Sequence, residues 1–474
     1  MLLEMEAAGV KNNGEKLLPI LSFTLVFSIM NASMFNVVMP VISKEFGITP
    51  SQVSWLLTGY MIVYAVGSVT YGKLADKYRL KDLLTFGLIF FALGSIVGLT
   101  ATEYWMIVLG RILQASGAAV IPATAMIVPV RYFSPEKRGR ALGTVAAGLA
   151  LGTALAPIVA GLVTTFASWR FLFLLSLIPL LALPFFRKYL DNQKGNAQKI
   201  DFLGGILLGG AVALALLAIS LGKWLLALAG AVLLVLFIIR IRTAADPFIH
   251  PKLFGNKKYS LGLFITFLAT ALSFGMPFVT PQFLSGLNHL SPAVIGLVMF
   301  PAAITSAFLG RKGGKLADEK GNSFLVYAAI SLSFVCFVLL SVFVGASPFL
   351  ILFLLIFGNT GQTFMQIAMS NTISRTLSKE QIGVGMGLMS LLNFISGAMS
   401  TSVIGKLLDA KDTSFHLNPV AMYNGAYVYS NIFFALAILA AVIVCIYYFS
   451  FSAFSGKRGL KAKLEERKSS STTA

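Results

Sequence analysis

Arg111 is the residue of this sequence best placed to do chemistry, because it stands inside a long apolar stretch at residues 106–130. In a membrane-crossing helix, five residues from the start of the stretch correspond to about 7 to 8 Å of depth. A guanidinium at that depth is costly unless it is paired, and such residues usually serve function. We expect Asn31, Gln114, backbone carbonyls or an anionic ligand to satisfy its charge. The alternative is that the side chain extends to the aqueous surface.

Acidic residues are missing from the middle of the apolar stretches, where a carboxylate could carry protons. None of the 18 acidic residues falls in the middle of an apolar stretch, although an intramembrane carboxylate is a common proton carrier. Proton carriage would therefore need a carboxylate at a helix end, with Asp76 and Glu45 as candidates. Arg111 is also left without an acidic partner, so we hypothesise that it meets a carboxylate, phosphate or enolate of a ligand.

A polar stripe lies in the apolar stretch 349–374, where Asn359, Gln362 and Gln366 follow helical spacing and share one face. Tyr60, Tyr64 and Asn393 are the other polar residues expected beside them, and together they predict a roomy apolar cavity for a small molecule with a few polar groups. The alternative for each polar residue is a hydrogen bond between helices.

The composition indicates that these residues are positioned by membrane helices. Hydrophobic residues make up 57% of the 474 residues and charged residues 12%, with a mean hydropathy of +0.84, which excludes a water-soluble enzyme. Polar breaks predict an all-α polytopic protein with fourteen transmembrane helices. Their expected ranges are 18–41, 55–72, 83–100, 106–130, 142–166, 170–186, 202–221, 225–239, 260–284, 295–310, 324–344, 349–374, 386–407 and 431–454.

Charge distribution predicts the orientation of these helices. With the N-terminus in the cytoplasm, 31 of the 37 lysines and arginines fall in cytoplasmic segments, so the positive-inside rule places both termini there. The tryptophans Trp55, Trp105, Trp169 and Trp224 then lie at the outer starts of even-numbered helices, where amphipathic rings are favoured. The net charge of +19 is thus explained by membrane insertion, and we expect no nucleic-acid partner.

Other kinds of site lack the residues that they need. Cys336 and Cys445 are the only cysteines, too few for a disulfide framework or a zinc site. The sequence contains no Walker-type phosphate loop, metal-ligand cluster or nucleophile elbow. We expect no cofactor, no metal and no enzymatic activity, so that energy for any transport comes from a gradient.

An internal repeat relates the two ends of the chain. The pentapeptide Gly-Lys-Leu-Ala-Asp occurs at residues 72–76 and again at 314–318, and the segment 134–143 is matched in phase by 378–387. Helices 1–6 therefore repeat as helices 9–14, with helices 7 and 8 inserted, and paired six-helix bundles are typical of transporters. The expected parts are a cytoplasmic extension at 1–17, a bundle at 18–186, the inserted pair at 202–239, a second bundle at 260–454 and a cytoplasmic tail at 456–474.

The repeated loop carries a family resemblance. Gly72, Asp76, Lys77 and Lys81 fit the loop signature of the major facilitator superfamily, with Arg79 where a second glycine is usual. The resemblance implies that this loop and its repeat, with Gly314 and Asp318, form the cytoplasmic gate. The alternative is that these residues only cap helices and obey charge topology.

Three further motifs resemble patterns of that superfamily, and the first-helix one resembles its fourteen-helix drug:proton antiporter branch. Arg111 and Gln114 match the superfamily's Arg-x-x-Gln-Gly motif, with Ala115 in the glycine position. The segment with Asn31, Ser33 and Asn36 resembles the first-helix pattern that has aspartate at the position of Asn31. Gly143, Gly152, Pro157 and Gly161 resemble the antiporter motif, which within the superfamily marks exporters rather than importers, so the resemblance implies efflux. Small-residue packing alone is the alternative.

These resemblances imply a function. The chain is similar to Gram-positive multidrug and tetracycline efflux proteins, which implies a monomeric exporter of amphipathic drugs or small organic compounds in the bacterial plasma membrane, driven by protons or another coupling ion. The first alternative is a dedicated exporter of an anionic metabolite or a self-made antibiotic, uncoupled or coupled to another ion. A membrane sensor that transports nothing is a further alternative, which the two intact repeat loops disfavour.

Overall fold

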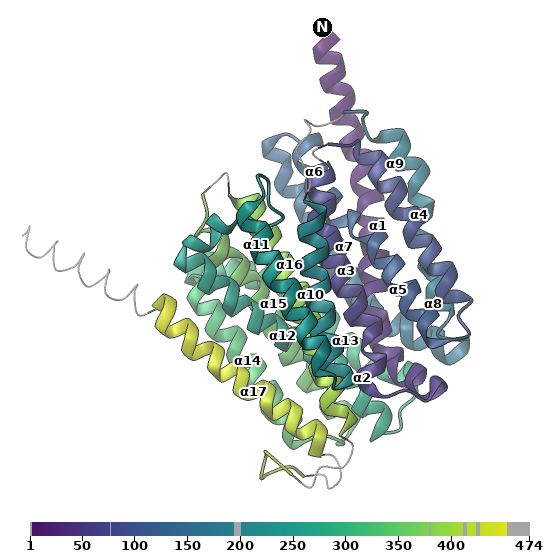
Figure 1. The fold of residues 1–474 in the computed structure, drawn as a ribbon, viewed down its shortest axis with the longest axis vertical. Coiled ribbons are helices and arrows are strands. Elements are labelled where there is room, and N and C mark those ends of the chain that lie inside the picture. The colour runs from purple at the N-terminus through teal and green to yellow at the C-terminus, as the bar shows by residue number, and fades with distance from the viewer. Residues whose placement is uncertain are drawn as a thin grey trace, which may run out of the picture.

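A computed structural model gives the fold, and it describes residues 2–75, 77–193, 201–378, 381–410, 415–422 and 427–452. Within these ranges the regular elements are all helices (Figure 1). Fourteen of them are long and apolar enough to cross a membrane. The prediction of an all-α, fourteen-helix membrane protein is confirmed.

The N-terminal half contains six membrane-crossing units, three of them interrupted. Ser54 separates α2 from α3, Ala119 separates α5 from α6, and a 3-10 turn with Pro179 interrupts the sixth unit. The elements are α1 (Leu2–Phe46), α2 (Pro50–Val53), α3 (Trp55–Ala75), α4 (Leu80–Leu99), α5 (Tyr104–Ala118), α6 (Val120–Tyr132), α7 (Pro135–Phe166), α8 (Phe171–Leu175), η1 (Ile178–Ala182) and α9 (Leu183–Tyr189).

The inserted pair and the C-terminal half supply the other eight crossings. The pair is α10 (Phe202–Leu221) and α11 (Trp224–Thr243), which are followed by η2 (Pro251–Gly255). The C-terminal half consists of α12 (Lys257–Gly286), α13 (Pro292–Lys320), α14 (Asn322–Val342), α15 (Pro348–Ser374), α16 (Ile382–Asp409), α17 (Tyr427–Tyr447) and η3 (Tyr448–Ser452).

Several helices extend beyond the predicted apolar stretches. The stretch expected at 295–310 lies in α13, which continues through the second Gly-Lys-Leu-Ala-Asp segment to Lys320. Similarly, α1 begins at Leu2, and Leu17, expected in a solvated extension, is fully buried. Polar residues can prolong a helix into the headgroup region because backbone hydrogen bonds are satisfied within the helix. The tail expected at 456–474 lies outside the described residues.

Helix contacts show how the halves join. Within the N-terminal half α1 packs along α7 and α4 along α5, and within the C-terminal half α14 packs along α15 and α17. The halves meet through α7 against α13 and α3 against α16. Helix α10 touches both α3 and α16, whereas α11 packs mainly on α10, so the inserted pair lies beside the junction of the two halves.

The two ends of the molecule differ in packing. At the end where α1 finishes and α2 begins, a Cβ added to Gly161 would lie 2.4 Å from the Pro292 carbonyl oxygen, and one on Gly296 would lie 2.3 Å from that of Pro157. We call this end the closed face. At the opposite end, where α3 and α13 finish, a Cβ on Gly72 or Gly314 would meet no heavy atom of the described chain within 4 Å.

We call this opposite end the basic face, because the cationic loops gather there. Its basic residues include Lys73, Lys77, Arg79, Lys81, Arg131, Lys137, Arg138, Arg187 and Lys188. The contrast in packing indicates a conformation in which the halves are packed together at the closed face, whereas the repeated glycines of the basic face have open space around them among the described residues. Such a one-sided junction is what one state of an alternating-access protein requires.

Candidate functional site

The Arg111 side chain is fully buried in the N-terminal half. Its Nη1 atom donates to Asn31 Oδ1 at 2.8 Å and to Gln114 Oε1 at 2.9 Å, and Nε donates to the Leu56 carbonyl oxygen at 3.2 Å. Asn31 and Gln114, both named from the sequence, are therefore brought to this cation. Zero exposure also contradicts the alternative that the side chain reaches the aqueous surface.

Two serines accept hydrogen bonds from the side-chain amides that contact Arg111. Gln114 Nε2 donates to Ser95 Oγ at 2.8 Å, and Asn31 Nδ2 donates to Ser176 Oγ. Each hydroxyl in turn donates to a carbonyl of its own helix segment, at Phe91 for Ser95 and at Leu172 for Ser176, both at 2.8 Å. Segments α1, α3, α4, α5 and α8 thus converge on one guanidinium. Connected networks of hydrogen bonds fix side-chain positions in a low-dielectric interior.

Two aromatic rings contact the guanidinium. Its Cζ atom lies 4.3 Å from the ring centroid of Phe35 and 4.1 Å from that of Tyr60, which is the range of favourable cation–π contacts. Tyr60 stacks on Tyr64 with centroids 5.7 Å apart, and Tyr64 meets Phe394 of α16 at 4.6 Å. A continuous aromatic chain therefore links the buried cation to the C-terminal half.

Two polar atoms at this site have no partner. Arg111 Nη2 and Tyr60 Oη are both buried without a hydrogen bond, and the salt bridges of the described residues include none to Arg111. A buried donor without a partner is costly. The geometry can therefore accept a further hydrogen-bond acceptor, and an anion would also balance the charge.

The residues predicted to line a cavity do not form one group in this conformation. Asn393, next to Phe394, accepts a hydrogen bond from Thr270 Oγ1 at 3.0 Å, which links α12 to α16. Asn359 Nδ2 donates to the Leu355 carbonyl of its own helix. Gln366 is exposed.

Gln362 has a separate environment inside the C-terminal half. Its Nε2 lies 3.5 Å from the Leu272 carbonyl oxygen, and its side chain lines a narrow pocket with Ser273, Ser333 and Met365. Tyr60 and Tyr64 are therefore the predicted cavity residues that the structure joins directly, and the shared cavity remains a prediction.

The first-helix and antiporter motifs lie at helix contacts. Asn36 Nδ2 donates to the Ser33 carbonyl at 3.0 Å, and both side chains are partly buried. A Cβ on Gly152 would lie 2.5 Å from the Val26 carbonyl oxygen of α1, so this glycine permits close approach. Gly161 and Pro157 lie at the contact with α13 already described, whereas Gly143 is exposed near the basic face.

Among the described residues, no ion pair joins the predicted gate residues to one another. Asp318 is exposed, and its side chain makes no hydrogen bond or ion pair with another described residue. Lys77 lies over the Tyr78 ring at 5.4 Å, and Lys81 is partly buried. Asp76 lies outside the described residues. Closure of the basic face by these loops remains a prediction.

Of the candidate proton carriers, Glu45 is already paired. It accepts hydrogen bonds from Trp169 Nε1 at 2.6 Å and Arg170 Nη1 at 2.8 Å, all within the N-terminal half. These contacts fix it as part of the closed-face end of that half.

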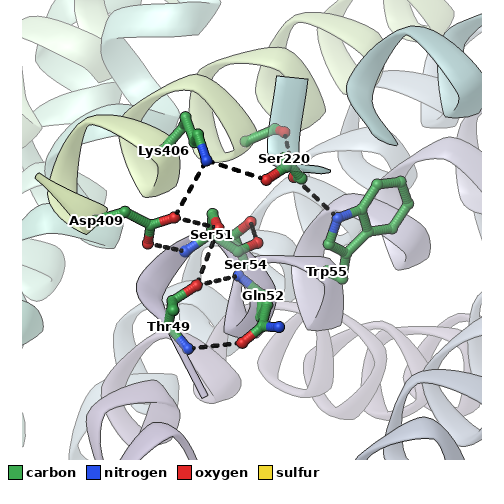
Figure 2. A network of polar contacts seen from close by, with 9 residues as sticks. Thr49, Ser51, Gln52, Ser54, Trp55, Ser220, Lys406 and Asp409 are labelled. Atoms are coloured by element: carbon green, nitrogen blue, oxygen red, sulfur yellow. Dashed lines mark hydrogen bonds and ion pairs between the residues drawn. The ribbon is translucent and has the colours of Figure 1, made fainter. Parts of the chain in front are cut away.

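A polar cluster at the closed face was not predicted from the sequence. Asp409, the last residue of α16, accepts hydrogen bonds from Ser51 of α2 through the backbone N–H at 3.0 Å and the hydroxyl at 2.5 Å (Figure 2). Lys406 Nζ lies 3.8 Å from Asp409 Oδ2. The only sequence signal was the Thr49–Gln52 capping box, which predicts a short helix but no distant partner.

Asp201 anchors the inserted pair at the basic face. It caps α10 through Gly204 N at 3.1 Å, accepts from Phe248 N at 3.1 Å and pairs with Arg240 Nε at 3.0 Å. Burial acts to raise the pKa of this carboxyl, but the hydrogen bonds from Arg240 and the two backbone amides outweigh it and leave the pKa below its usual value.

Comparisons with known proteins bear on what these sites serve. A family model described as Major Facilitator Superfamily matches residues 21–401. The riboflavin transporter RibZ of Clostridioides difficile (strain 630) is 26% identical over 391 residues, which cover 81% of this chain and 86% of that protein. The lincomycin resistance protein LmrB of Bacillus subtilis (strain 168) is 28% identical over 346 residues, which cover 69% of this chain and 71% of that protein.

The fold is shared with solved structures. A bacterial homolog of the human lysosomal transporter Spinster, in an inward-facing and unoccupied conformation, superimposes with a TM-score of 0.65 at 12% identity and covers 92% of this chain and 97% of that one. At this identity the likeness shows a common architecture.

Proposed function

Since this chain belongs to the Major Facilitator Superfamily, and is therefore a membrane transporter rather than an enzyme, we propose that it exports amphipathic drugs or small organic compounds by proton-driven antiport. The observation that carries the proposal is the one-sided junction of its halves, with Gly161 packed against Pro292 and Gly296 against Pro157 at the closed face, and Gly72 and Gly314 uncovered at the basic face. An exporter takes up its substrate in such a conformation when the uncovered face is cytoplasmic.

The orientation follows from charge. We infer that the basic face is cytoplasmic in a bacterial plasma membrane, with both termini on that side, because lysines and arginines concentrate there. The protein works as a monomer: each chain carries both halves of the repeat and hence a complete pathway between them.

Export is favoured over import by two lines of support. The antiporter motif packs α7 against α1 and α13 through Gly152 and Gly161, and that motif accompanies efflux in the family resemblance. In addition, the lincomycin resistance protein LmrB is among the relatives. Proton coupling uses a carboxylate at a helix end, because the described membrane interior around Arg111 offers none.

A second function is favoured by the Arg111 site itself. The buried guanidinium has an unpartnered Nη2 and no acidic partner among the described residues, which suits a dedicated exporter of an anionic metabolite with non-proton coupling or none. Anionic here means a carboxylate, phosphate or enolate that approaches Nη2 and Tyr60 Oη. The likeness to the riboflavin transporter RibZ is compatible with such a metabolite substrate.

Accumulation in efflux-deficient bacteria tests both functions. Cells expressing the chain are given fluorescent dyes, tetracycline and anionic compounds, with and without a protonophore, beside an Arg111→Ala variant. The exposed Arg242→Ala change is the matched control. Proton-driven export is supported if expressing cells accumulate less of a compound than empty cells and the protonophore removes this difference.

Three other results have distinct meanings. Export that survives the protonophore contradicts proton antiport. Export of anionic compounds that is unchanged in Arg111→Ala contradicts the anion-binding role of that residue. If no compound distinguishes expressing from empty cells while the protein is correctly inserted, broad drug export is refuted.

A further inference from the structure

Three parts of the molecule meet in one polar cluster at the closed face, shown in Figure 2. Ser51 belongs to the N-terminal half, Ser220 to α10 of the inserted pair, and Asp409 with Lys406 to α16 of the C-terminal half. We call these four residues the closed-face latch. Contacts among these four residues join the C-terminal half to each of the other two parts, and none of the functional motifs in the sequence includes them.

Asp409 joins the two halves through charge-assisted bonds. Its two carboxylate oxygens receive the N–H and the hydroxyl of Ser51, 358 residues away in sequence. Ser51 is 2% exposed and the Asp409 side chain 18%, so water competes weakly for these bonds. Hydrogen bonds to an ionised group are stronger than neutral ones.

The inserted pair contributes the third arm through Ser220. Its carbonyl oxygen accepts from Lys406 Nζ at 3.3 Å, and its hydroxyl accepts from Trp55 Nε1 of α3 at 3.1 Å. Ser220 lies near the end of α10, where carbonyl groups lack helical partners and attract cations. One residue of the insert therefore holds both halves at the same point.

A second contact lies beneath the latch, between α3 and α16. Thr58 of α3 and Thr401 of α16 are both fully buried, with their hydroxyl oxygens 3.1 Å apart. Opening of the closed face requires the two halves to separate there. Separation of α2 and α3 from α16 breaks both the Asp409–Ser51 bonds and the Thr58–Thr401 bond.

We propose that the closed-face latch is the gate that sets how often this face opens, with Asp409 as its central acceptor and Ser220 as the arm through which the inserted helices take part. The inference rests on the proposed alternating-access function and adds a role for α10. Loss of one latch contact shifts the equilibrium toward the state that is open at the closed face.

Thiol accessibility tests the latch without any substrate. Thr58→Cys is placed in a Cys445→Ser background, because Cys445 is the exposed native cysteine and Cys336 is buried. Purified protein in nanodiscs is labelled with a polar maleimide, and Asp409→Asn is compared with the parent. We expect labelling about tenfold faster, the ratio expected when a charge-assisted bond becomes a neutral one.

Control variants separate gating from general damage. Glu103→Gln removes an exposed carboxylate at the same face and should leave the rate unchanged. Ser51→Ala should speed labelling, and combining it with Asp409→Asn should add little, because both act on one contact. Asp409→Glu, which keeps the charge, should label more slowly than Asp409→Asn.

A variant and a control test the contact made by the inserted helix. Ser220→Ala removes the hydroxyl that accepts a hydrogen bond from Trp55. It should speed labelling about threefold, as expected for the loss of one neutral hydrogen bond. Ser273→Ala removes a hydroxyl that bonds only within α12 and should not change the rate.

Equal labelling of the parent, Asp409→Asn and Ser51→Ala, with all three unfolding at the same temperature, overturns the latch. If Ser220→Ala is labelled at the same rate as the parent, only the proposed role of α10 is overturned. Because labelling needs no exported compound, failure of the latch and failure of the export function are observed separately.

Discussion

Replacing Arg111 by lysine keeps the buried positive charge but removes the planar guanidinium with its several N–H donors. The substitution therefore measures how much the planar group contributes to the free energy of unfolding. In the structure Nε reaches the Leu56 carbonyl while Nη1 reaches Asn31 and Gln114, and the Phe35 and Tyr60 ring centroids lie 4.3 and 4.1 Å from Cζ. A lysine ammonium is a single point of donation and cannot occupy all of these directions.

The magnitude follows from the lost contacts. One hydrogen bond from a charged group, such as that to Leu56, contributes about 1.5 to 3 kcal/mol. Part of a desolvated cation–π contact, about 2 kcal/mol when whole, is lost as well. We therefore expect the free energy of unfolding to fall by about 2 to 4 kcal/mol in Arg111→Lys.

Tryptophan fluorescence during chemical unfolding in detergent provides the assay, because all four tryptophans precede α12 and report on the N-terminal half and the insert. The exposed Arg242→Lys substitution is the control and should change stability by less than about 0.5 kcal/mol. An Arg111→Lys protein as stable as the parent would refute the reasoning that the planar group organises this site.

Three other substitutions test neighbouring claims. Asn31→Asp places a carboxylate beside Nη1 of the buried arginine and should make export more sensitive to a protonophore; an unchanged sensitivity speaks against proton coupling at this position. Gly161→Ala puts a Cβ 2.4 Å from a backbone oxygen and should cost about 1 to 3 kcal/mol of unfolding free energy, while Gly143→Ala, with open space around it, should cost nothing. Asp201→Asn should lower thermal stability at pH 7, because the pKa of Asp201 is lowered in the folded protein. The ionised carboxylate then stabilises the fold fully at pH values above its ordinary pKa of about 3.9, and this stabilisation is lost as pH falls through the lower pKa of the folded state. A deficit that persists in full at pH 2 to 3 would contradict this account of Asp201.

The fourteen helices could be predicted because each needs only a run of apolar residues long enough to span a bilayer. Their ends could not, since a helix such as α13 continues to Lys320 through polar residues that hydropathy assigns to a loop. The grouping of Arg111 with Asn31 and Gln114 could also be anticipated, because a buried cation needs acceptors and few polar residues stand at comparable depth.

The rest of the site depends on tertiary contacts that leave no local signal. The Leu56 carbonyl and the Phe35 ring are ordinary features of apolar helices, and only packing brings them to the guanidinium. Ser51 and Asp409 are common residues at helix ends, separated by 358 positions. Gln362 has helical spacing with its neighbours in the polar stripe, yet it points into its own half, because spacing fixes a face and not its partner.

The most direct test of alternating access at the closed face is a reversible cross-link between Thr58→Cys and Thr401→Cys in the Cys445→Ser background. The two hydroxyl oxygens are 3.1 Å apart across the junction of the halves, so we expect oxidation to join the introduced thiols. Export of a compound identified in the accumulation assay should then stop, and reduction should restore it. Full cross-linking with export at the parental rate would contradict the account.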